Sequence, residues 1–146
     1  MNYNEIEILF AEDNADDAFL TIRALRKSGL ANKLHLVNDG EEALDFLFCK
    51  GIYQSHNCLE KLKLILLDLK MPKVSGIEVL EIVKSDPRLK TIPVVILTSS
   101  KEDPDIKQCY ALGANSYIVK PVESGDFLNA IQSLGMYWMI TSQPWE

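Results

Sequence analysis

The sequence predicts an α/β protein with a doubly wound, five-stranded parallel sheet, in strand order 2-1-3-4-5 and with helices on both faces. Short apolar segments alternate along the chain with longer segments of helical periodicity, in five successive units. The apolar segments are nearly continuous, which is typical of parallel strands buried on both faces. Right-handed crossovers leave few topologies for five such units, and this strand order is the natural one.

The elements follow one another regularly. The predicted strands span residues 6–11, 34–37, 63–68, 92–98 and 116–119. The predicted helices span residues 15–28, 40–48, 75–84, 102–112 and about 124–140. No repeat, linker or change in composition divides the chain, so we expect a single domain over residues 1–146, with a core of about 5–135 and an aromatic extension at 136–146.

Several helix ends carry capping signals. Asn14 is a suitable N-cap, with Asp17 three residues later. Ser75 and Glu78 have the spacing of a capping box. Gly113 is placed to end the fourth helix. These signals support the predicted boundaries.

Residues 50–61 interrupt the regular pattern. This connection is longer than the usual ~4–6 residues and contains Gly51, Ser55, His56 and Asn57. We expect an irregular surface excursion that could serve as a recognition element. His35 and His56 have no metal-ligand spacing, so structural or solvated roles are expected for both.

The bulk composition excludes several classes of protein. A net charge of −6 argues against DNA binding, which needs a basic face. No N-terminal signal sequence is evident, and no apolar run reaches the roughly 20 residues that a membrane span needs. The three cysteines form no C-x-x-C pair, which argues against a disulfide framework or a zinc site. We therefore expect a cytoplasmic protein that neither binds DNA nor enters a membrane.

Polar residues follow the ends of four predicted strands. The carboxyl ends of parallel strands meet at one edge of a doubly wound sheet, near the point where the strand order reverses. The sequence therefore gathers a set of carboxylate, hydroxyl and ammonium groups at this edge. The set consists of Glu12, Asp13, Asp68, Thr98, Ser99 and Lys120.

These residue types suit metal-assisted phosphoryl transfer. Three neighbouring carboxylates repel one another, and a bound cation such as Mg²⁺ relieves the repulsion through hard oxygen ligands. We expect Asp13 and Asp68 to bind the metal directly and Glu12 to bind it through a water. Asp68 then acts as the nucleophile toward phosphorus, while Lys120 and Thr98 hold phosphoryl oxygens.

The same residues carry a family resemblance. Residues 8–14, 65–72, 95–99 and 117–121, in this order, resemble the motifs of receiver domains in two-component response regulators. The resemblance implies a flavodoxin-like fold and phosphotransfer from a histidine of a sensor kinase to Asp68. It also implies that Thr98 and Tyr117 form a switch pair and that the Lys70 backbone carbonyl binds metal.

Three further features are similar to the stand-alone regulators that partner cyanobacterial and bacterial phytochromes. They are the excursion at 50–61, the Pro72-Lys73 turn and the aromatic C-terminus. By this resemblance the partner is a phytochrome-type sensor histidine kinase. Lys70 and Ser100 occupy positions that are expected to tune the lifetime of the phosphoryl group, in a direction that the sequence does not give.

The last helix has more apolar residues than one face can hold. Phe127, Ile131, Leu134 and Trp138 share a helical face, whereas the other apolar residues cannot join it because successive residues turn by about 100°. These others are Met136, Tyr137, Met139 and Ile140, with Trp145 beyond them. We expect a homodimer or a kinase-docking surface here, the alternative being a tail that folds back over the domain.

The same residues leave other functions open. The leading hypothesis is a phosphoacceptor switch that catalyses only its own phosphorylation and dephosphorylation. A non-phosphorylated pseudo-receiver would act as an interaction module, and Tyr117 could be plain half-buried core. A flavin-binding electron carrier would need a phosphate loop where Glu12-Asp13-Asn14 stands, and a phosphatase with a D-x-D motif would need an acid in place of Lys70.

Overall fold

Five parallel strands form one sheet. The computed structural model describes residues 2–29, 33–99 and 101–135. The strand order is β2-β1-β3-β4-β5, which confirms the predicted topology. The strands are β1 Ile8–Ala11, β2 Leu34–Val37, β3 Leu64–Asp68, β4 Val94–Thr98 and β5 Ser116–Val119.

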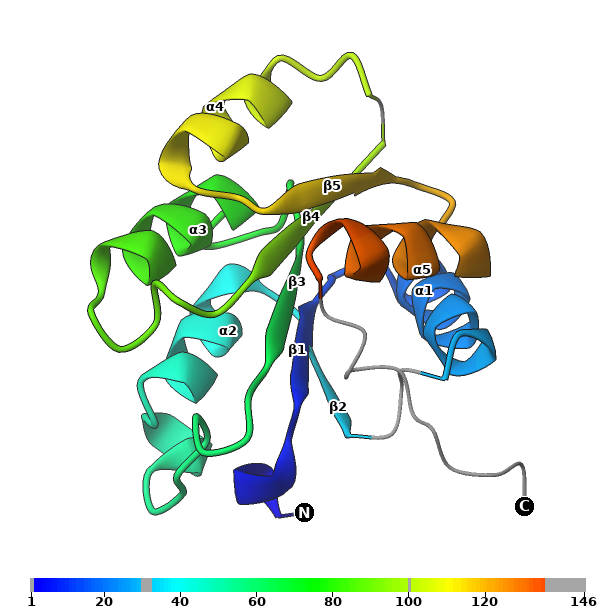
Figure 1. Cartoon of the computed structure of the whole chain (residues 1–146). Helices are drawn as coiled ribbons and strands as arrows, with labels where there is room; N and C mark the ends of the chain where they lie inside the picture. The colour runs from blue at the N-terminus through cyan, green and yellow to red at the C-terminus, as the bar shows by residue number, and fades with distance from the viewer. Residues whose placement is uncertain (1, 30–32, 100, 136–146) are drawn as a thin grey trace.

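Helices cover both faces of the sheet. Helices α1 and α5 lie side by side on one face, and α2, α3 and α4 cover the other (Figure 1). The helices are α1 Ala15–Lys27, α2 Gly40–Leu47, α3 Gly76–Ser85, α4 Asp105–Leu112 and α5 Ser124–Ser133. Two 3₁₀ turns, η1 Tyr3–Glu5 and η2 Gly51–Tyr53, lie near the end at which the strands begin.

The two faces of the sheet have separate cores. Successive residues of a strand point to opposite faces, so Leu64 and Leu66 pack beneath α1 and α5, while Ile65 and Leu67 pack beneath the other helices. Every residue of β3 and β4 is buried. This explains why the apolar segments of the sequence are continuous and not alternating.

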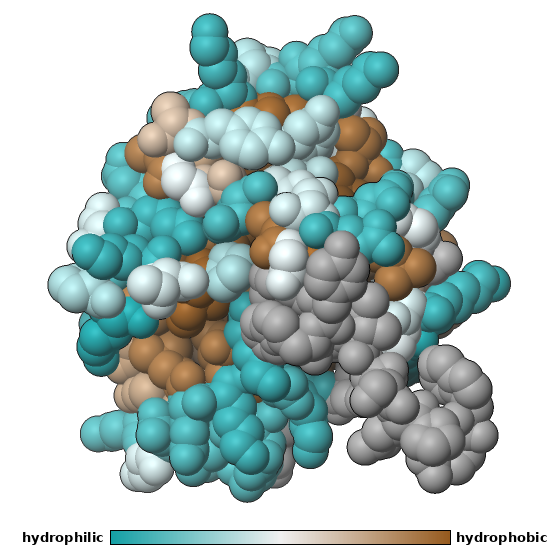
Figure 2. Space-filling view, in the orientation of Figure 1, coloured by the Kyte–Doolittle hydropathy of each residue, from teal (hydrophilic) through white to brown (hydrophobic). Residues whose placement is uncertain are grey.

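The outer surface is mostly hydrophilic on the face shown in Figure 2, with hydrophobic side chains visible between the hydrophilic ones. Exposed large hydrophobic side chains include Phe19, which is 65% exposed on α1. Within the described residues, no helix is long and apolar enough to cross a lipid bilayer.

The predicted helix signals are confirmed. The Asn14 side chain accepts a hydrogen bond of 2.9 Å from the Asp17 backbone N–H. Ser75 and Glu78 form the capping box, each side chain accepting from the backbone N–H of the other, at 3.1 and 3.2 Å. Gly113 adopts a φ of 109°, the left-handed conformation that favours glycine at a helix end.

Several predicted boundaries were too generous. β1 begins at Ile8 and β4 at Val94. The apolar pattern predicts earlier starts because Ile6 and Ile92 are also buried, although they precede the strands. α4 begins at Asp105 and not at 102; the side chain of Asp103 accepts from the Asp105 N–H at 2.9 Å just before the helix. α5 ends at Ser133, and residues 136–146 lie outside the described part of the chain.

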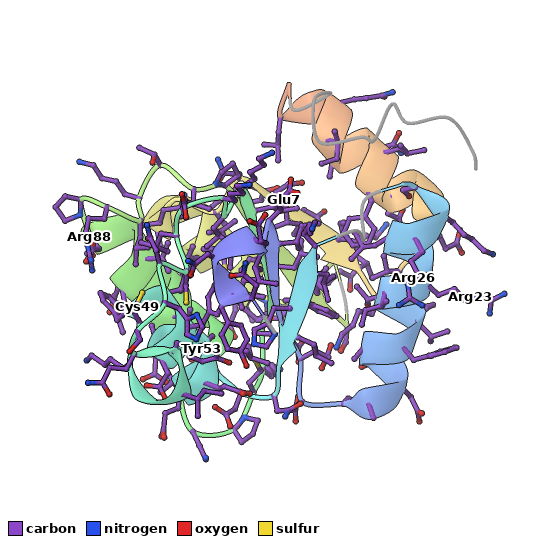
Figure 3. All side chains as sticks on the ribbon, turned by 90° about the horizontal axis from the view of Figure 1, so that it is seen from below. Glu7, Arg23, Arg26, Cys49, Tyr53 and Arg88 are labelled. Carbon is purple, nitrogen blue, oxygen red and sulfur yellow. The ribbon has the colours of Figure 1, made fainter. Side chains whose placement is uncertain are left out.

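The prediction of a surface excursion at 50–61 is wrong in part. Tyr53 is 1% exposed and Cys58 is fully buried, so this segment anchors itself in the core of the α2 face. The Tyr53 hydroxyl lies 2.8 Å from His35 Nε2. Figure 3, seen from below, shows Tyr53 of η2 among the side chains between the helices, whereas Arg23 extends outward from α1. The segment is irregular in backbone but ordered by its aromatic anchor.

Candidate functional site

The strand ends bring the predicted polar residues together. Asp68 ends β3 and Thr98 ends β4, while Glu12 and Lys120 directly follow β1 and β5. A pocket of about 230 Å³ opens at this edge of the sheet. Its lining includes every predicted strand-end residue together with Lys70, and adds neighbours that were not predicted. The lining residues are Glu12, Asp13, Asn14, Asp17, Asp68, Leu69, Lys70, Thr98, Ser99, Asp103 and Lys120.

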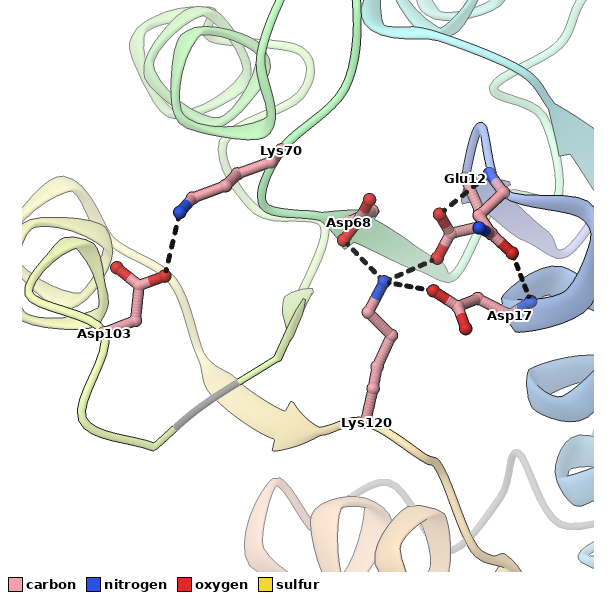
Figure 4. A network of polar contacts seen from close by, with 7 residues as sticks. Glu12, Asp17, Asp68, Lys70, Asp103 and Lys120 are labelled. Carbon is pink, nitrogen blue, oxygen red and sulfur yellow. Dashed lines mark hydrogen bonds and ion pairs between the residues drawn. The ribbon is translucent and has the colours of Figure 1, made fainter.

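Lys120 lies at the centre of the site. Its ammonium nitrogen is 3.1 Å from Glu12 Oε1, 2.9 Å from Asp17 Oδ2 and 3.1 Å from Asp68 Oδ1 (Figure 4). The side chain is only 12% exposed. Burial opposes its positive charge, but the hydrogen bonds to Asp17, Asp68 and Glu12 outweigh burial and raise the pKa of Lys120. Lys120 therefore stays protonated in the site.

Three carboxylates form a candidate cation site. Oxygen atoms of Glu12, Asp13 and Asp68 lie within 4.8 Å of one another. Asp13 is exposed, whereas Glu12 and Asp68 are buried, so the cluster opens to solvent on one side. A set of carboxylate oxygens fits hard divalent cations such as Mg²⁺ or Mn²⁺. The residues present thus fit the predicted metal.

Burial and the repulsion between the carboxylates of this cluster affect the pKa of Glu12. Its side chain is fully buried. Burial, together with the charge of Asp68, raises the pKa of Glu12 to about 7. The Asn14 N–H, 3.2 Å from Glu12 Oε2, and the Lys120 ammonium offset this effect only in part. A bound cation would supply the missing positive charge.

Lys70 faces away from the acidic cluster. Its ammonium lies 3.8 Å from Asp103 Oδ2, on the far side of the pocket mouth (Figure 4). Lys70 is 79% exposed and Asp103 only 11%. The pair joins the segment after β3 to the start of α4. In this arrangement the Lys70 side chain does not contact Asp68.

The two predicted switch residues lie in different surroundings. Thr98 is 1% exposed and lines the pocket. Tyr117 is half-buried on β5 and does not line it. Its ring packs edge-on against Tyr110 of α4, with centroids 6.0 Å apart. Ser100, the other position expected to tune the site, lies outside the described residues.

Two acids that line the pocket, Asp17 and Asp103, were not predicted from the sequence as site residues. Asp17 is one helical turn after Asp13, so a helical projection could have placed both at the same end of α1. An acid in a first turn has an ordinary explanation in the helix dipole, which is why Asp17 did not stand out as more than a capping partner. Asp103 lies in the loop that follows β4, at the same edge of the sheet, but no motif or spacing marks it as the residue of that loop that lines the pocket.

The fold and the site together define a class of protein, the phosphoacceptors built on a doubly wound sheet with an acidic cation site. The model of the response regulator receiver domain matches residues 8–132 of the chain. The chain therefore belongs to the family of response regulator receiver domains.

Curated relatives of similar length support this membership. The response regulator Rcp1 of Synechocystis is 37% identical over 134 residues, which are 92% of this chain and 89% of the relative. A probable methanogenesis regulatory protein of Methanothrix harundinacea, FilR2, is 38% identical over 133 residues, which are 90% of this chain and 83% of the relative.

Solved structures agree in fold. The bacteriophytochrome response regulator AtBRR is 46% identical with a TM-score of 0.84, covering 94% of this chain and 98% of that one. The Mn²⁺-bound form of Rcp1 is 35% identical with a TM-score of 0.73, covering 97% of this chain and 99% of that one. Receiver domains bind a divalent cation, and the acidic cluster of this chain has the composition for one.

Proposed function

We propose that Asp68 accepts a phosphoryl group from a phosphohistidine of a sensor kinase. One observation carries the proposal. Asp68 Oδ1 lies 3.1 Å from the Lys120 ammonium, in a pocket that also contains the carboxylates of Asp13 and Glu12. A carboxylate nucleophile, a fixed cation and a divalent-metal cluster are the parts that phosphoryl transfer to an acid needs.

The transfer itself requires little covalent help. An Asp68 oxygen attacks phosphorus opposite the histidine nitrogen, and the P–O bond forms as the P–N bond breaks. The electron pair of the P–N bond stays on that nitrogen, and the imidazole leaves as the neutral ring with the proton that its other nitrogen already carries. Asp13, Asp68 and the Lys70 carbonyl would hold a divalent cation directly, and Glu12 would hold it through a water. Such a cation would neutralise charge on one phosphoryl oxygen. Lys120 binds a second oxygen and the Thr98 hydroxyl a third. Ser99 is small and leaves the entrance open.

The output follows from the change at Asp68. Thr98 moves toward the phosphoryl oxygens, Tyr117 changes rotamer, and the α4–β5–α5 surface changes with it. The edge contact between Tyr117 and Tyr110 is one that such a rotamer change would alter. The chain catalyses only its own phosphorylation and dephosphorylation, and it passes the signal on by protein contact or phosphorelay.

The partner in this proposal is a phytochrome-type histidine kinase. The support is the 46% identity to a bacteriophytochrome response regulator, over nearly the whole of both chains. We further propose that residues 1–146 act as one cytoplasmic receiver domain that forms a homodimer through the last helix and the aromatic segment. Residues 136–146, on which the dimer depends, lie outside the described part of the chain.

The test is phosphorylation by a small phosphodonor. With Mg²⁺ and acetyl phosphate, the wild-type protein should gain one acid-labile phosphoryl group, detected by intact-mass spectrometry. Asp68→Asn should gain none, because an amide is no nucleophile toward phosphorus. Asp16→Asn, which removes an exposed acid on α1, is the matched control and should react like wild type.

Two outcomes would count against the proposal. An adduct of equal yield in Asp68→Asn would place the acceptor elsewhere. No adduct in the wild-type protein with any phosphodonor would favour the pseudo-receiver, an interaction module that takes no phosphate.

A further inference from the structure

The Lys120 ammonium has an unexpected partner in Asp17. The distance from Lys120 Nζ to Asp17 Oδ2, 2.9 Å, is the shortest of its three carboxylate contacts. Asp17 lies in the first turn of α1 and Lys120 just after β5, so the contact joins residues 103 positions apart. Asp17 belongs neither to the strand ends nor to the three-carboxylate cluster.

The number of N–H donors on the Lys120 ammonium shows how the contact with Asp17 affects the contact with Asp68. A lysine ammonium has three N–H donors, and three carboxylates accept from Lys120 here. Glu12 and Asp17 accept two of the hydrogen bonds, which leaves the third for Asp68. When Asp68 carries a phosphoryl group, that third donor can meet a phosphoryl oxygen without moving the other two.

Orientation matters because lysine is flexible. Its long side chain loses rotamer freedom when it is fixed, and a site that fixes it beforehand avoids that cost when the phosphoryl charge arrives. Glu12 is shared between Lys120 and the cation cluster. Asp17 lies outside the cluster, so it can hold Lys120 whether or not a cation is bound.

We propose that Asp17 is a positioning residue, which aims the Lys120 ammonium at the phosphoryl group on Asp68. The inference rests on the proposed phosphorylation of Asp68 and assigns a role to a residue beyond the strand-end set. Asp17 acts through Lys120 and does not itself contact the reacting atoms.

The charge of Asp17 has an opposing effect. A further carboxylate beside Glu12, Asp13 and Asp68 repels a phosphoryl group, so its removal could strengthen binding. Asp17 is 37% exposed, and solvent screens its charge. Lys120 is 12% exposed, so its hydrogen bonds are screened much less. We therefore expect the lost hydrogen bond to outweigh the relieved repulsion.

Beryllofluoride with Mg²⁺ serves as the probe, because it occupies the place of a phosphoryl group on a carboxylate. Its dissociation constant is measured by calorimetry. Asp17→Ala should weaken binding about tenfold, the effect of losing one hydrogen bond between charged groups. Asp17→Asn keeps an acceptor oxygen without the charge and should recover most of the affinity. Asp16→Ala removes a neighbouring exposed acid of the same turn and should match wild type.

Each result bears on a different part of the inference. Equal affinities for Asp17→Ala and Asp16→Ala would overturn the positioning role. Tighter binding by both Asp17→Ala and Asp17→Asn would also overturn it, because Asp17 would then act only as a repelling charge. A wild-type protein that fails to bind the probe would overturn the proposed function and the positioning role with it. Thermal unfolding of each variant excludes misfolding as the cause.

Discussion

The two ends of the sheet handle polar groups in opposite ways. At the carboxyl end, Glu12, Asp13 and Asp68 lie together with Lys120 as their buried cation. At the amino end, the rings of Tyr3, Phe46 and Tyr53 surround His35, and His56 packs against Tyr3. Ring centroids there lie between 4.8 and 6.5 Å apart, and the Tyr53 hydroxyl meets His35 Nε2. We call this second group the aromatic cluster.

The aromatic cluster stabilises the fold, whereas the acidic site is suited to binding a cation at a cost in stability. The aromatic cluster buries apolar area and pairs the Tyr53 hydroxyl with His35 Nε2, so it stabilises the fold without any added group. The acidic site keeps like charges together and raises the pKa of Glu12, which destabilises the metal-free protein. Substitutions at the two ends should therefore change stability in opposite directions.

Removing Tyr53 should produce the largest change in stability. Tyr53→Ala deletes a buried ring and the hydroxyl that meets His35, so we expect a loss of about 3–5 kcal/mol in the free energy of unfolding, the range for large buried aromatic residues. Urea unfolding measures it. Tyr110→Ala, at a tyrosine that is 47% exposed, is the control and should cost far less. Similar losses in the two variants would show that the aromatic cluster is no anchor.

Substituting Glu12 should stabilise the metal-free protein. The pKa of Glu12 rises from 4.5 to about 7 on folding, so the wild-type protein loses stability as the pH rises through this range. Glu12→Gln removes the ionisation and should add roughly 1–3 kcal/mol at pH 8 and little near pH 4.5. Urea unfolding in a chelator at both pH values measures the difference.

Glu81→Gln, at an exposed glutamate of α3, is a matched control and should not increase the free energy of unfolding at pH 8. A Glu12→Gln protein less stable than wild type at pH 8 would mean that its contact with Lys120 outweighs burial. The acidic site would then resemble the amino end of the sheet, and the contrast between the two ends would fail.

The Lys70–Asp103 pair should modulate cation binding weakly. Asp103→Asn removes a negative charge and frees the Lys70 ammonium, so Mg²⁺ should bind about two- to fivefold less tightly. Lys70→Ala should bind Mg²⁺ more tightly by a similar factor. These effects are small because Lys70 is 79% exposed, and they should fade with added salt.

Calorimetric titration with Mg²⁺ measures both variants. Lys73→Ala is the control, because Lys73 pairs with Asp39 at 3.6 Å and does not line the pocket. If Asp103→Asn has the same effect in the Lys70→Ala background as alone, the two residues act independently.

Substituting His35 should have the smallest effect, a change in how the free energy of unfolding depends on pH. Burial lowers its pKa from the usual 6.5, so the folded protein favours the neutral ring and loses stability as the pH falls below about 6.5. In the Glu12→Gln background, which removes the opposing slope, His35→Phe should reduce the loss between pH 7.5 and 5.5. Unfolding curves at the two pH values measure it, and an unchanged loss would exclude His35 as its source.

Much of this protein could be read along the chain because its signals are local. Continuous apolar strands, the capping box at Ser75 and Glu78, and Gly113 each depend on near neighbours in sequence. The fold class, the strand order and the polar residues at the strand ends follow from them. The strands begin later than 6 and 92, because burial continues beyond the hydrogen bonds that define a strand. The fourth helix begins later than 102, where the Asp103 side chain accepts from the Asp105 N–H ahead of it.

By itself, the sequence determined the parallel sheet and the meeting of Glu12, Asp13, Asp68, Thr98 and Lys120 at one edge, since strand direction places all strand ends there. Only the tertiary structure decided which side chains meet across that edge. Asp17 meets Lys120, Asp103 meets Lys70, and Tyr53 reaches into the core under His35. These contacts join residues from 18 to 103 positions apart. Their partners are set by the packing of whole elements, a property that no local pattern of residues contains.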